Sequence, residues 1–350
     1  MKLREKTTFR RKYGLLLLLL CMISLAVLCI CFRFRRLFPV RLLDIGKILL
    51  NKLFPAVFHF SGTTWTEMDE QVIYYMVFPR ITVSFIIGAA LSVAGASYQA
   101  VFNNPMASPR VLGVSSGACF GAALAIYLGA ARPQIILSAL GFGLLSMLLV
   151  YTLSKTVRKD FSYTLILIGI MVGSLFELGV SYIKMIGDPY GSLPEITYWL
   201  MGSVANMKLE MVGWIGIPVL LCLIALFLLR WRMNFLSMGE EEARSMGVNI
   251  RRLRLVVIFI AGLLTAISIS FTGMIGFVGL VVPNFVRLMV GDDQRLVLPV
   301  SVLTGGSFLM LANHISCNMS PMIIPLGIIT SFVGVPFFIY CILLKGKKHA

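Results

Sequence analysis

Long apolar runs recur along the sequence, each close to the roughly 20 residues that a helix needs to cross the hydrocarbon core of a membrane. We count about ten runs of this kind, at residues 14–32, 80–100, 112–130, 134–154, 163–184, 210–230, 253–272, 276–290, 297–313 and 324–344. Only 13% of the residues are charged, against roughly 25% in soluble domains. The sequence therefore predicts an all-α polytopic membrane protein, with residues 1–350 forming a single transmembrane domain.

The runs at 276–290 and 297–313 are short and contain Pro283 and Pro299. Because broken helices in lipid need neighbouring protein to satisfy their backbone groups, we expect both to be interrupted and to lie inside the bundle. Small residues allow helices to approach closely in lipid. We therefore expect small, closely packed helix faces at the glycines of the second and third runs, which are Gly88, Gly95, Gly113, Gly117 and Gly121.

The first run follows a basic segment, residues 1–13, and could be confused with a signal peptide. It is longer than a typical signal-peptide core and lacks an A-x-A cleavage pattern, so we expect a retained transmembrane helix. Basic residues cluster before this helix, at 155–160, at 230–254 and at the C-terminal tail. If ten helices are counted, all four clusters fall on one side, which the positive-inside rule assigns to the cytoplasm.

Orientation and domain boundaries follow from that count. Residues 1–13 and the C-terminus are predicted to be cytoplasmic, 33–79 to be external, and 231–252 to form a cytoplasmic loop. The segment 33–52 is basic although the count places it outside. An amphipathic stretch in the membrane interface would explain this exception. The net charge of +16 is thus attributed to topology, since no nucleic-acid-binding module is present.

The sequence contains no group of residues that indicates catalysis. A P-loop requires GxxxxGK[ST], but Gly46-Lys47 is followed by Ile48, and Gly346-Lys347 lies in the tail. We find no nucleophile–base set and no cysteine or histidine spacing typical of a metal site. We therefore expect a protein that is not an enzyme and that binds no metal or cofactor itself.

The predicted loop 231–252 contains a short charged segment. Ser237 could cap a helix with Glu240 as its capping-box partner, and Gly247 could end that helix in the left-handed conformation. The segment is either a solvated loop or a docking element for a cytoplasmic partner.

Several blocks resemble one known family. These blocks are Phe78-Pro79-Arg80 with the Gly88–Gly95, Gln99–Pro105 and Gly113–Gly117 segments; Tyr198–Gly202; GEEEARSMGVNIRRLR at 239–254; Gly276–Arg287; and Pro325–Phe338. In this order they resemble the FecCD-type permeases of ABC importers for ferric siderophores, haem and cobalamin. The resemblance covers roughly residues 70–344.

The resemblance implies a type II ABC importer fold, like that of cobalamin-importer permeases, in the bacterial inner membrane. It implies a second permease subunit, two ATPase subunits that bind ATP and Mg, and an external substrate-binding protein. Residues matching the ATPase-coupling loop are Gly239, Glu240, Glu241, Ala243, Arg244 and Gly247. The family's inner gate maps to Ser162, Tyr163 and Thr164, which by themselves indicate only a polar helix start.

Docking of the binding protein is assigned by the same resemblance to Arg80. Two further arginine positions of the family correspond to Val77 and to the region of Cys317, so the arginine set is incomplete here, and the basic segment 33–52 could substitute. Arg80 could alternatively be a snorkelling charge at a helix end.

Glu177 lies deep within an apolar run, where an acid by default faces a cavity or a partner. Our hypothesis is that it lines the path or pairs with Lys184; a protonated acid packed between helices is the alternative. The predicted cargo is a ferric siderophore, with haem or cobalamin as alternatives. A secondary transporter driven by an ion gradient and a non-transporting scaffold remain rival functions.

Overall fold

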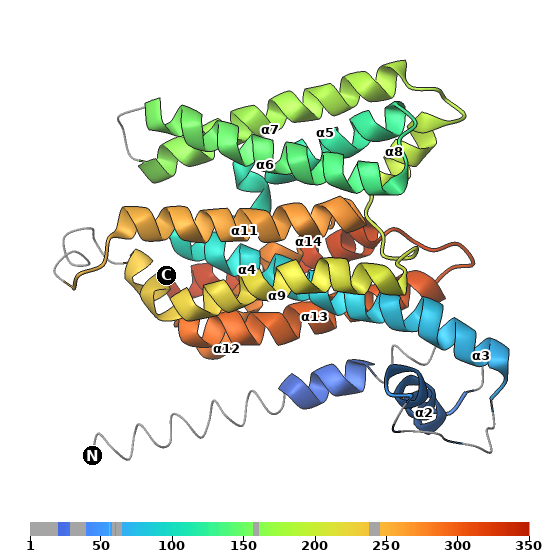
Figure 1. Cartoon of the computed structure of the whole chain (residues 1–350). Coiled ribbons are helices and arrows are strands. Elements are labelled where there is room, and N and C mark those ends of the chain that lie inside the picture. Colours follow the sequence, from blue (N-terminus) through green and yellow to red (C-terminus); the bar gives the residue numbers. More distant parts are fainter. Residues whose placement is uncertain are drawn as a thin grey trace, which may run out of the picture.

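The computed structural model of the chain describes residues 20–28, 40–55, 57, 60, 65–156, 161–237 and 246–349. The described part is all-α, as predicted (Figure 1). Its elements are α2 (Leu42–Leu53), α3 (Glu67–Val72), η1 (Ile73–Val77), α4 (Phe78–Phe102), η2 (Pro109–Leu112), α5 (Val114–Tyr127), α6 (Arg132–Thr156), α7 (Phe161–Ile186), α8 (Ser192–Leu200), α9 (Leu209–Met233), η3 (Asn234–Ser237), α11 (Ile250–Thr272), α12 (Val278–Val290), α13 (Gln294–Asn318) and α14 (Leu326–His349).

Six helices of the described residues are long and apolar enough to cross a membrane, and three shorter apolar helices accompany them. The shorter ones are Val114–Tyr127, Val278–Val290 and Leu326–Tyr340. Residues 20–28, inside the first apolar run, are also helical. The polytopic fold with about ten transmembrane helices is thus the one that the hydropathy predicts.

The second apolar run belongs to a longer helix than expected. α3, η1 and α4 form one 36-residue helix, Glu67–Phe102. A capping box at Thr66 and Asp69 starts it. Pro79 has no N–H to donate to residue 75, and the preceding turn is a π-helix in which the Phe78 N–H bonds to the Ile73 carbonyl.

Helix α4 lies at the centre of one bundle and packs against α9, α11, α12 and α13 (Figure 1). A Cβ at Gly88 would overlap the carbonyl of Gly305, and a Cβ at Gly95 would overlap that of Gly279. Because only hydrogen fits at these positions, the backbones of α4, α12 and α13 touch. The predicted small face of this helix is confirmed.

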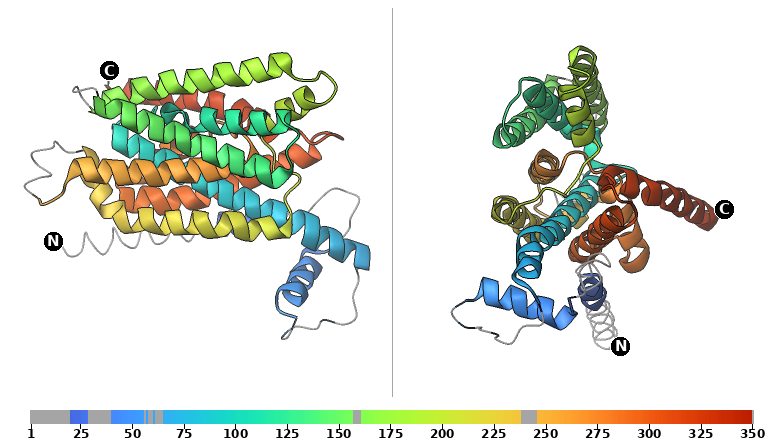
Figure 2. Two further views of the ribbon diagram at one scale, coloured as in Figure 1. Left: turned by 45° about the horizontal axis from the view of Figure 1, so that its top comes forward. Right: turned by 90° about the vertical axis from the view of Figure 1, so that its right-hand side faces the viewer.

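A second group consists of α5, α6 and α7, with α8 at one end (Figures 1 and 2). Gly117 and Gly121 of α5 face the carbonyls of Phe142 and Ser138 on α6. Gly113 serves a different purpose, because its φ of +68° makes the turn between η2 and α5. This turn shortens the helix expected over 112–130.

Both proline-containing runs continue through their prolines. α12 is short, with 13 residues, as expected, but the break predicted at Pro283 is wrong, because Pro283 lies inside this helix as its sixth residue. The prediction of a short, broken helix at 297–313 is wrong, because α13 continues through Pro299 for 25 residues. Pro299 is the sixth residue, so its ring costs one hydrogen bond near the helix start, where Asp293 caps the backbone N–H of Arg295.

The segment 33–52 contains the amphipathic helix α2. Ile45 and Ile48 are buried against Ile73, Val77 and neighbouring residues, whereas Leu43 and Lys47 are exposed. Helix α2 and the start of α3 lie at one end of the bundle, and the facing ends of α9 and α11 lie at the other (Figure 1). The described helix of the basic segment therefore lies at the opposite end from the described ends of the 231–252 connection, and the side of the membrane on which each lies stays a prediction.

Candidate translocation path and coupling sites

Two helices of the bundle are too short to cross a membrane. With 14 and 13 residues, α5 and α12 span about 20 Å each, whereas the hydrocarbon core is about 30 Å thick. Each follows irregular backbone, η2 before α5 and residues 273–277 before α12. Such backbone is tolerated at membrane depth where it is buried in protein or lines a cavity.

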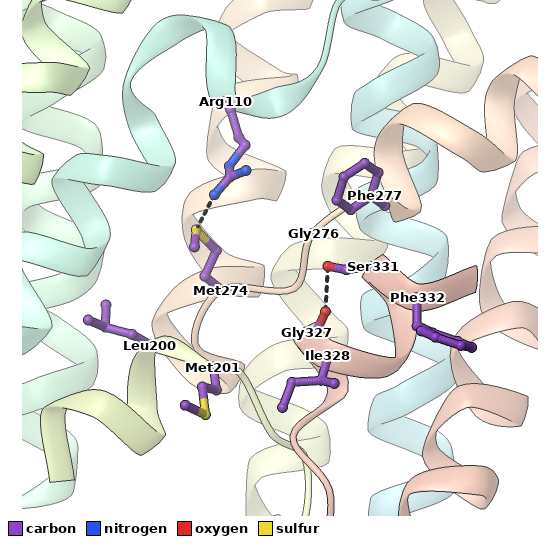
Figure 3. A pocket seen from close by; sticks show the side chains of 10 residues that line it. All are labelled: Arg110, Leu200, Met201, Met274, Gly276, Phe277, Gly327, Ile328, Ser331 and Phe332. Atoms are coloured by element: carbon purple, nitrogen blue, oxygen red, sulfur yellow. Dashed lines mark hydrogen bonds between the residues drawn. The ribbon is translucent and has the colours of Figure 1, made fainter. Parts of the chain in front are cut away.

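A cavity of about 550 Å³ lies at this irregular backbone (Figure 3). We call it the Arg110 cavity; it is lined by Arg110, Leu200, Met201, Met274, Gly276, Phe277, Gly327, Ile328, Ser331 and Phe332. In Figure 3 the Arg110 guanidinium points to Met274, and its Nη2 is 3.1 Å from the sulfur. A smaller cavity of about 240 Å³ adjoins it and shares Arg110, Met274, Gly276 and Phe277.

Phe277 begins α12 in an unusual conformation. Its φ of +65° is left-handed, which costs free energy for a residue with a Cβ and occurs most often at functional sites. Gly334 of α14 leaves room for it, since a Cβ there would meet the Cβ of Phe277. The sequence did not single out Arg110 or Phe277, although Phe277 lies in a family-like block and Arg110 lies between two segments of another.

Glu177 lies on α7 and accepts a hydrogen bond of 3.0 Å from the Ser116 hydroxyl of α5. Its side chain is exposed in the single chain. The structure thus gives the carboxylate a hydroxyl partner on α5 in place of the expected Lys184. The role of Glu177 in the path stays a prediction.

Arg80 is buried near the start of α4. It donates hydrogen bonds to the Cys317 sulfur at 3.1 Å and to the Ala205 carbonyl at 2.9 Å. The guanidinium therefore ties α4 to α13 and to the segment before α9, beside Cys317, where the family would place another arginine. Docking by Arg80 stays a prediction. In this conformation its side chain makes hydrogen bonds within the subunit.

The predicted gate residues lie at the start of α7, on a turn of that helix. Tyr163 is exposed and Thr164 is buried. The side chain of Ser162 lies outside the described residues. The gating role of these residues stays a prediction.

Most of the predicted coupling residues, Gly239, Glu240, Glu241, Ala243 and Arg244, lie outside the described residues. Gly247 is described and has the expected left-handed conformation, with φ of +76°. The adjacent surface has a cavity of about 930 Å³ that includes Trp231, Arg232, Gly247 and Arg252.

Hydrogen bonds connect this end of the bundle to its centre. Asn234 of η3 donates to the Asp293 carboxylate at 2.8 Å and accepts from the Gln294 backbone at 2.8 Å. The side chain of Asn284 on α12 donates to the Pro105 carbonyl at 2.8 Å. The end of α9 is therefore tied to the start of α13, and α12 is tied to the segment after α4.

Among the described residues, no three His, Cys, Asp or Glu side chains are grouped as a metal site requires. The Arg110 cavity and the smaller cavity beside it are lined by apolar side chains, hydroxyls and the guanidinium of Arg110. This lining suits the binding of a ligand.

The model of the FecCD transport family matches residues 16–344. The chain belongs to the FecCD transport family. It is 36% identical over 299 residues to the molybdate import system permease MolB of Haemophilus influenzae, covering 85% of this chain and 89% of MolB. The cobalamin import system permease BtuC of Halobacterium salinarum is 36% identical, over 81% of this chain and 75% of BtuC.

Two further matches concern metal chelates. A probable iron chelatin permease of Helicobacter pylori is 33% identical, over 81% of this chain and 85% of that protein. A solved structure described as an inward-facing metal-chelate type ABC transporter superposes with a TM-score of 0.83 at 32% identity, covering 94% of this chain and 99% of that one.

This FecCD permease is therefore the multi-pass membrane subunit of an ABC importer, a family that works with ATPase and substrate-binding subunits. It is not an enzyme, because the ATPase activity resides in the partner subunit. Family membership excludes the ion-gradient-driven transporter and the scaffold that the sequence left open.

Proposed function

We propose that this FecCD permease forms the translocation path for an iron chelate, a ferric siderophore, handed over by an external binding protein. The observation that carries the proposal is the Arg110 cavity at the two short helices, α5 and α12. Its volume of about 550 Å³ falls within the range of roughly 300–1,000 Å³ typical of small-molecule sites. The cargo class is supported by the iron chelatin relative and the metal-chelate transporter structure. Relatives named for cobalamin and hemin keep those cargoes as alternatives.

The proposal includes a second permease subunit, as either a homodimer or a heterodimer, and two ATPases that bind ATP and Mg. Helix α14 projects from the bundle and contacts α12 and α13 (Figure 2, right). Its apolar residues Phe332 and Ile339 are exposed in the single chain. A second permease beside α14 would close the open flank of the Arg110 cavity, and lipid would cover the remaining apolar faces.

In the proposed orientation both termini and the 231–252 connection are cytoplasmic, and 33–79 is external. The ATPases engage residues 239–247, and ATP binding there moves α9 and α11, switching the side from which the path is open. The binding protein docks at the opposite end, near Arg80 or the basic segment 33–52. Ser162, Tyr163, Thr164 and Glu177 line or gate the path.

Uptake of labelled ferric siderophore, haem and cobalamin by cells with and without the gene tests the cargo. We expect deletion to abolish ferric siderophore uptake and the cloned gene to restore it. Loss of haem or cobalamin uptake, with siderophore uptake intact, would replace the proposed cargo.

A further inference from the structure

Arg110 is the charged side chain that lines both cavities at the short helices α5 and α12. It belongs to η2, which precedes α5 at membrane depth, and its side chain is exposed to the cavity. An arginine at this depth is costly, and by default it faces a path or a partner of opposite charge. Its position therefore requires an explanation beyond packing.

The contact that the structure gives Arg110 does not neutralise it. The guanidinium donates to the thioether sulfur of Met274 at 3.1 Å, which is uncharged and a weak acceptor. None of the described residues that line the two cavities is an aspartate or glutamate. The positive charge is therefore available to an occupant of the cavity.

Two further parts of the lining suit an anion. Helix α12 starts at Val278 beside Phe277 without a side-chain cap, and the positive end of its dipole adds to the potential of the guanidinium, although the Val278 and Leu280 N–H groups bond to backbone carbonyls. Ser108 and Ser115 supply hydroxyls to the smaller cavity, whereas the Ser331 hydroxyl donates to the Gly327 carbonyl.

Glu177 is an acidic side chain that could be expected to pair with the Arg110 guanidinium, but its hydrogen-bond partner is a hydroxyl. Its carboxylate accepts the Ser116 hydroxyl, and both Glu177 and Arg110 lie within electrostatic reach of Cys119. No ion pair joins Glu177 to Arg110 in the described part of the chain. Glu177 thus leaves the Arg110 donors other than the one on Met274 available to an occupant of the cavity.

We propose that Arg110 binds an anionic oxygen group of the cargo in the Arg110 cavity and makes this permease selective for negatively charged chelates. The planar guanidinium suits a carboxylate, a catecholate or an inorganic oxyanion, because it can donate two parallel hydrogen bonds. The identity of the ligand, a metal chelate, rests on the proposed function. The positive potential of the cavity does not depend on that function.

Charge-selective labelling tests that potential without any cargo. Ser331→Cys is introduced as a reporter into the permease–ATPase complex in nanodiscs, and the complex without this substitution gives the background of native cysteines. Reaction rates are measured with anionic sulfonatoethyl and cationic trimethylammonium-ethyl methanethiosulfonate. We expect the anionic reagent to be favoured, and Arg110→Gln to lower the anionic-to-cationic rate ratio roughly fivefold or more. Arg110→Lys should keep the preference, and Arg230→Gln, far from the cavity on α9, should not change it.

An anionic-to-cationic ratio that Arg110→Gln leaves unchanged would overturn the inference. The same would hold if Arg230→Gln lowered the ratio equally. Thermal stability of each complex, measured in parallel, separates misfolding from loss of charge, and Arg110→Lys provides the second variant if Arg110→Gln does not fold.

Transport by proteoliposomes holding the complete importer then identifies the source of the anion. The probes are a ferric tris-catecholate, which is anionic, ferrioxamine B, which is cationic, and molybdate. We expect Arg110→Gln to reduce uptake of the tris-catecholate at least about tenfold, while ATP hydrolysis stimulated by the loaded binding protein persists. Equal uptake of both ferric chelates that is insensitive to Arg110→Gln would contradict the inference.

If molybdate alone were carried and depended on Arg110, the proposed cargo would be wrong and the anion contact would stand. If no probe were carried, the proposed function would fail on these cargoes and the labelling rates would still decide the inference.

Discussion

Helices α4 and α7 both cross the bundle, but they are covered to very different extents. In the most apolar window, 72% of the residues of the α4 span are buried, compared with 22% for α7. Helix α4 is surrounded by α9, α11, α12 and α13, whereas α7 contacts mainly α5, α6 and η2. The difference separates a fixed centre from a helix whose outer face is available to lipid, a second subunit or cargo.

The sequences of the two helices explain this contrast. Helix α4 is rich in Gly, Ala and Ser, which lets neighbouring backbones approach on several sides. Helix α7 carries large apolar side chains such as Met171, Leu175 and Leu178, which point away from the bundle. A closely packed element moves as a rigid unit, while a sparsely packed one can shift against its neighbours.

The largest effect is expected at the α4 contact. Gly95→Leu places a side chain against the Gly279 backbone, which cannot move without separating α4 from α12. We expect a loss of more than about 3 kcal/mol of stability, seen as loss of folded protein by size-exclusion chromatography and thermal unfolding. Gly141→Leu on α6 is the matched control, because a Cβ there meets nothing within 4 Å. Equal tolerance of both changes would remove the distinction between centre and periphery.

A second large effect concerns the connection between α9 and α11, which both pack on α4. Glu241→Arg or Gly247→Trp should reduce copurification of the partner ATPase at least about tenfold. The first reverses a charge at the interface, and the second puts a large side chain at a φ of +76°, which disfavours residues with a Cβ. Charge reversal at the opposite end, Glu67→Arg on α3, should leave the complex intact. A wild-type complex after both changes at the connection would argue against docking there.

A moderate effect is expected on α7. Glu177→Gln keeps the shape and the Ser116 hydrogen bond but removes the charge. We expect a several-fold change in cargo uptake with unchanged stability, because charges in a transport path act on cargo and on nearby basic groups. Glu210→Gln, in the first turn of α9, is the control. Unchanged uptake in the Glu177 variant would assign this acid to packing.

The smallest effect is expected outside the bundle, where Lys52 of α2 lies 3.0 Å from Glu70 of α3. The hydrogen bond from Lys52 to Glu70 and the attraction between their charges raise the Lys52 pKa above 10.5. The stability from this pair is therefore full below the unfolded pKa and is lost as the pH rises through the folded one. Because exposed pairs contribute about 0–1 kcal/mol, Glu70→Gln should lower the Lys52 pKa, measured by pH-dependent acylation, with little change in stability. Asp44→Asn, beside Lys47, is the matched control. An equal change in the Lys52 pKa in the Asp44 variant would contradict the pairing of Lys52 with Glu70.

Much of the fold could be predicted because lipid leaves few options to a backbone. The apolar runs predicted the helices, and the glycines predicted close packing at Gly88 and Gly95. The breaks at Pro283 and Pro299 were predicted wrongly, since a single proline near a helix start removes only one hydrogen bond. The π-turn before Pro79 and the early start at Glu67 were not visible, because hydropathy does not report helix boundaries.

The sequence by itself determined the membrane environment, the family and the absence of a P-loop, because these depend on composition and on short linear patterns. Only the tertiary structure placed Arg110, Phe277 and Ser331 around one cavity, since they come from segments far apart in the chain. It also turned Arg80 inward, onto Cys317 and Ala205. The physical reason is that a linear pattern specifies where helices form, while backbone contacts between helices decide which side chains share a space.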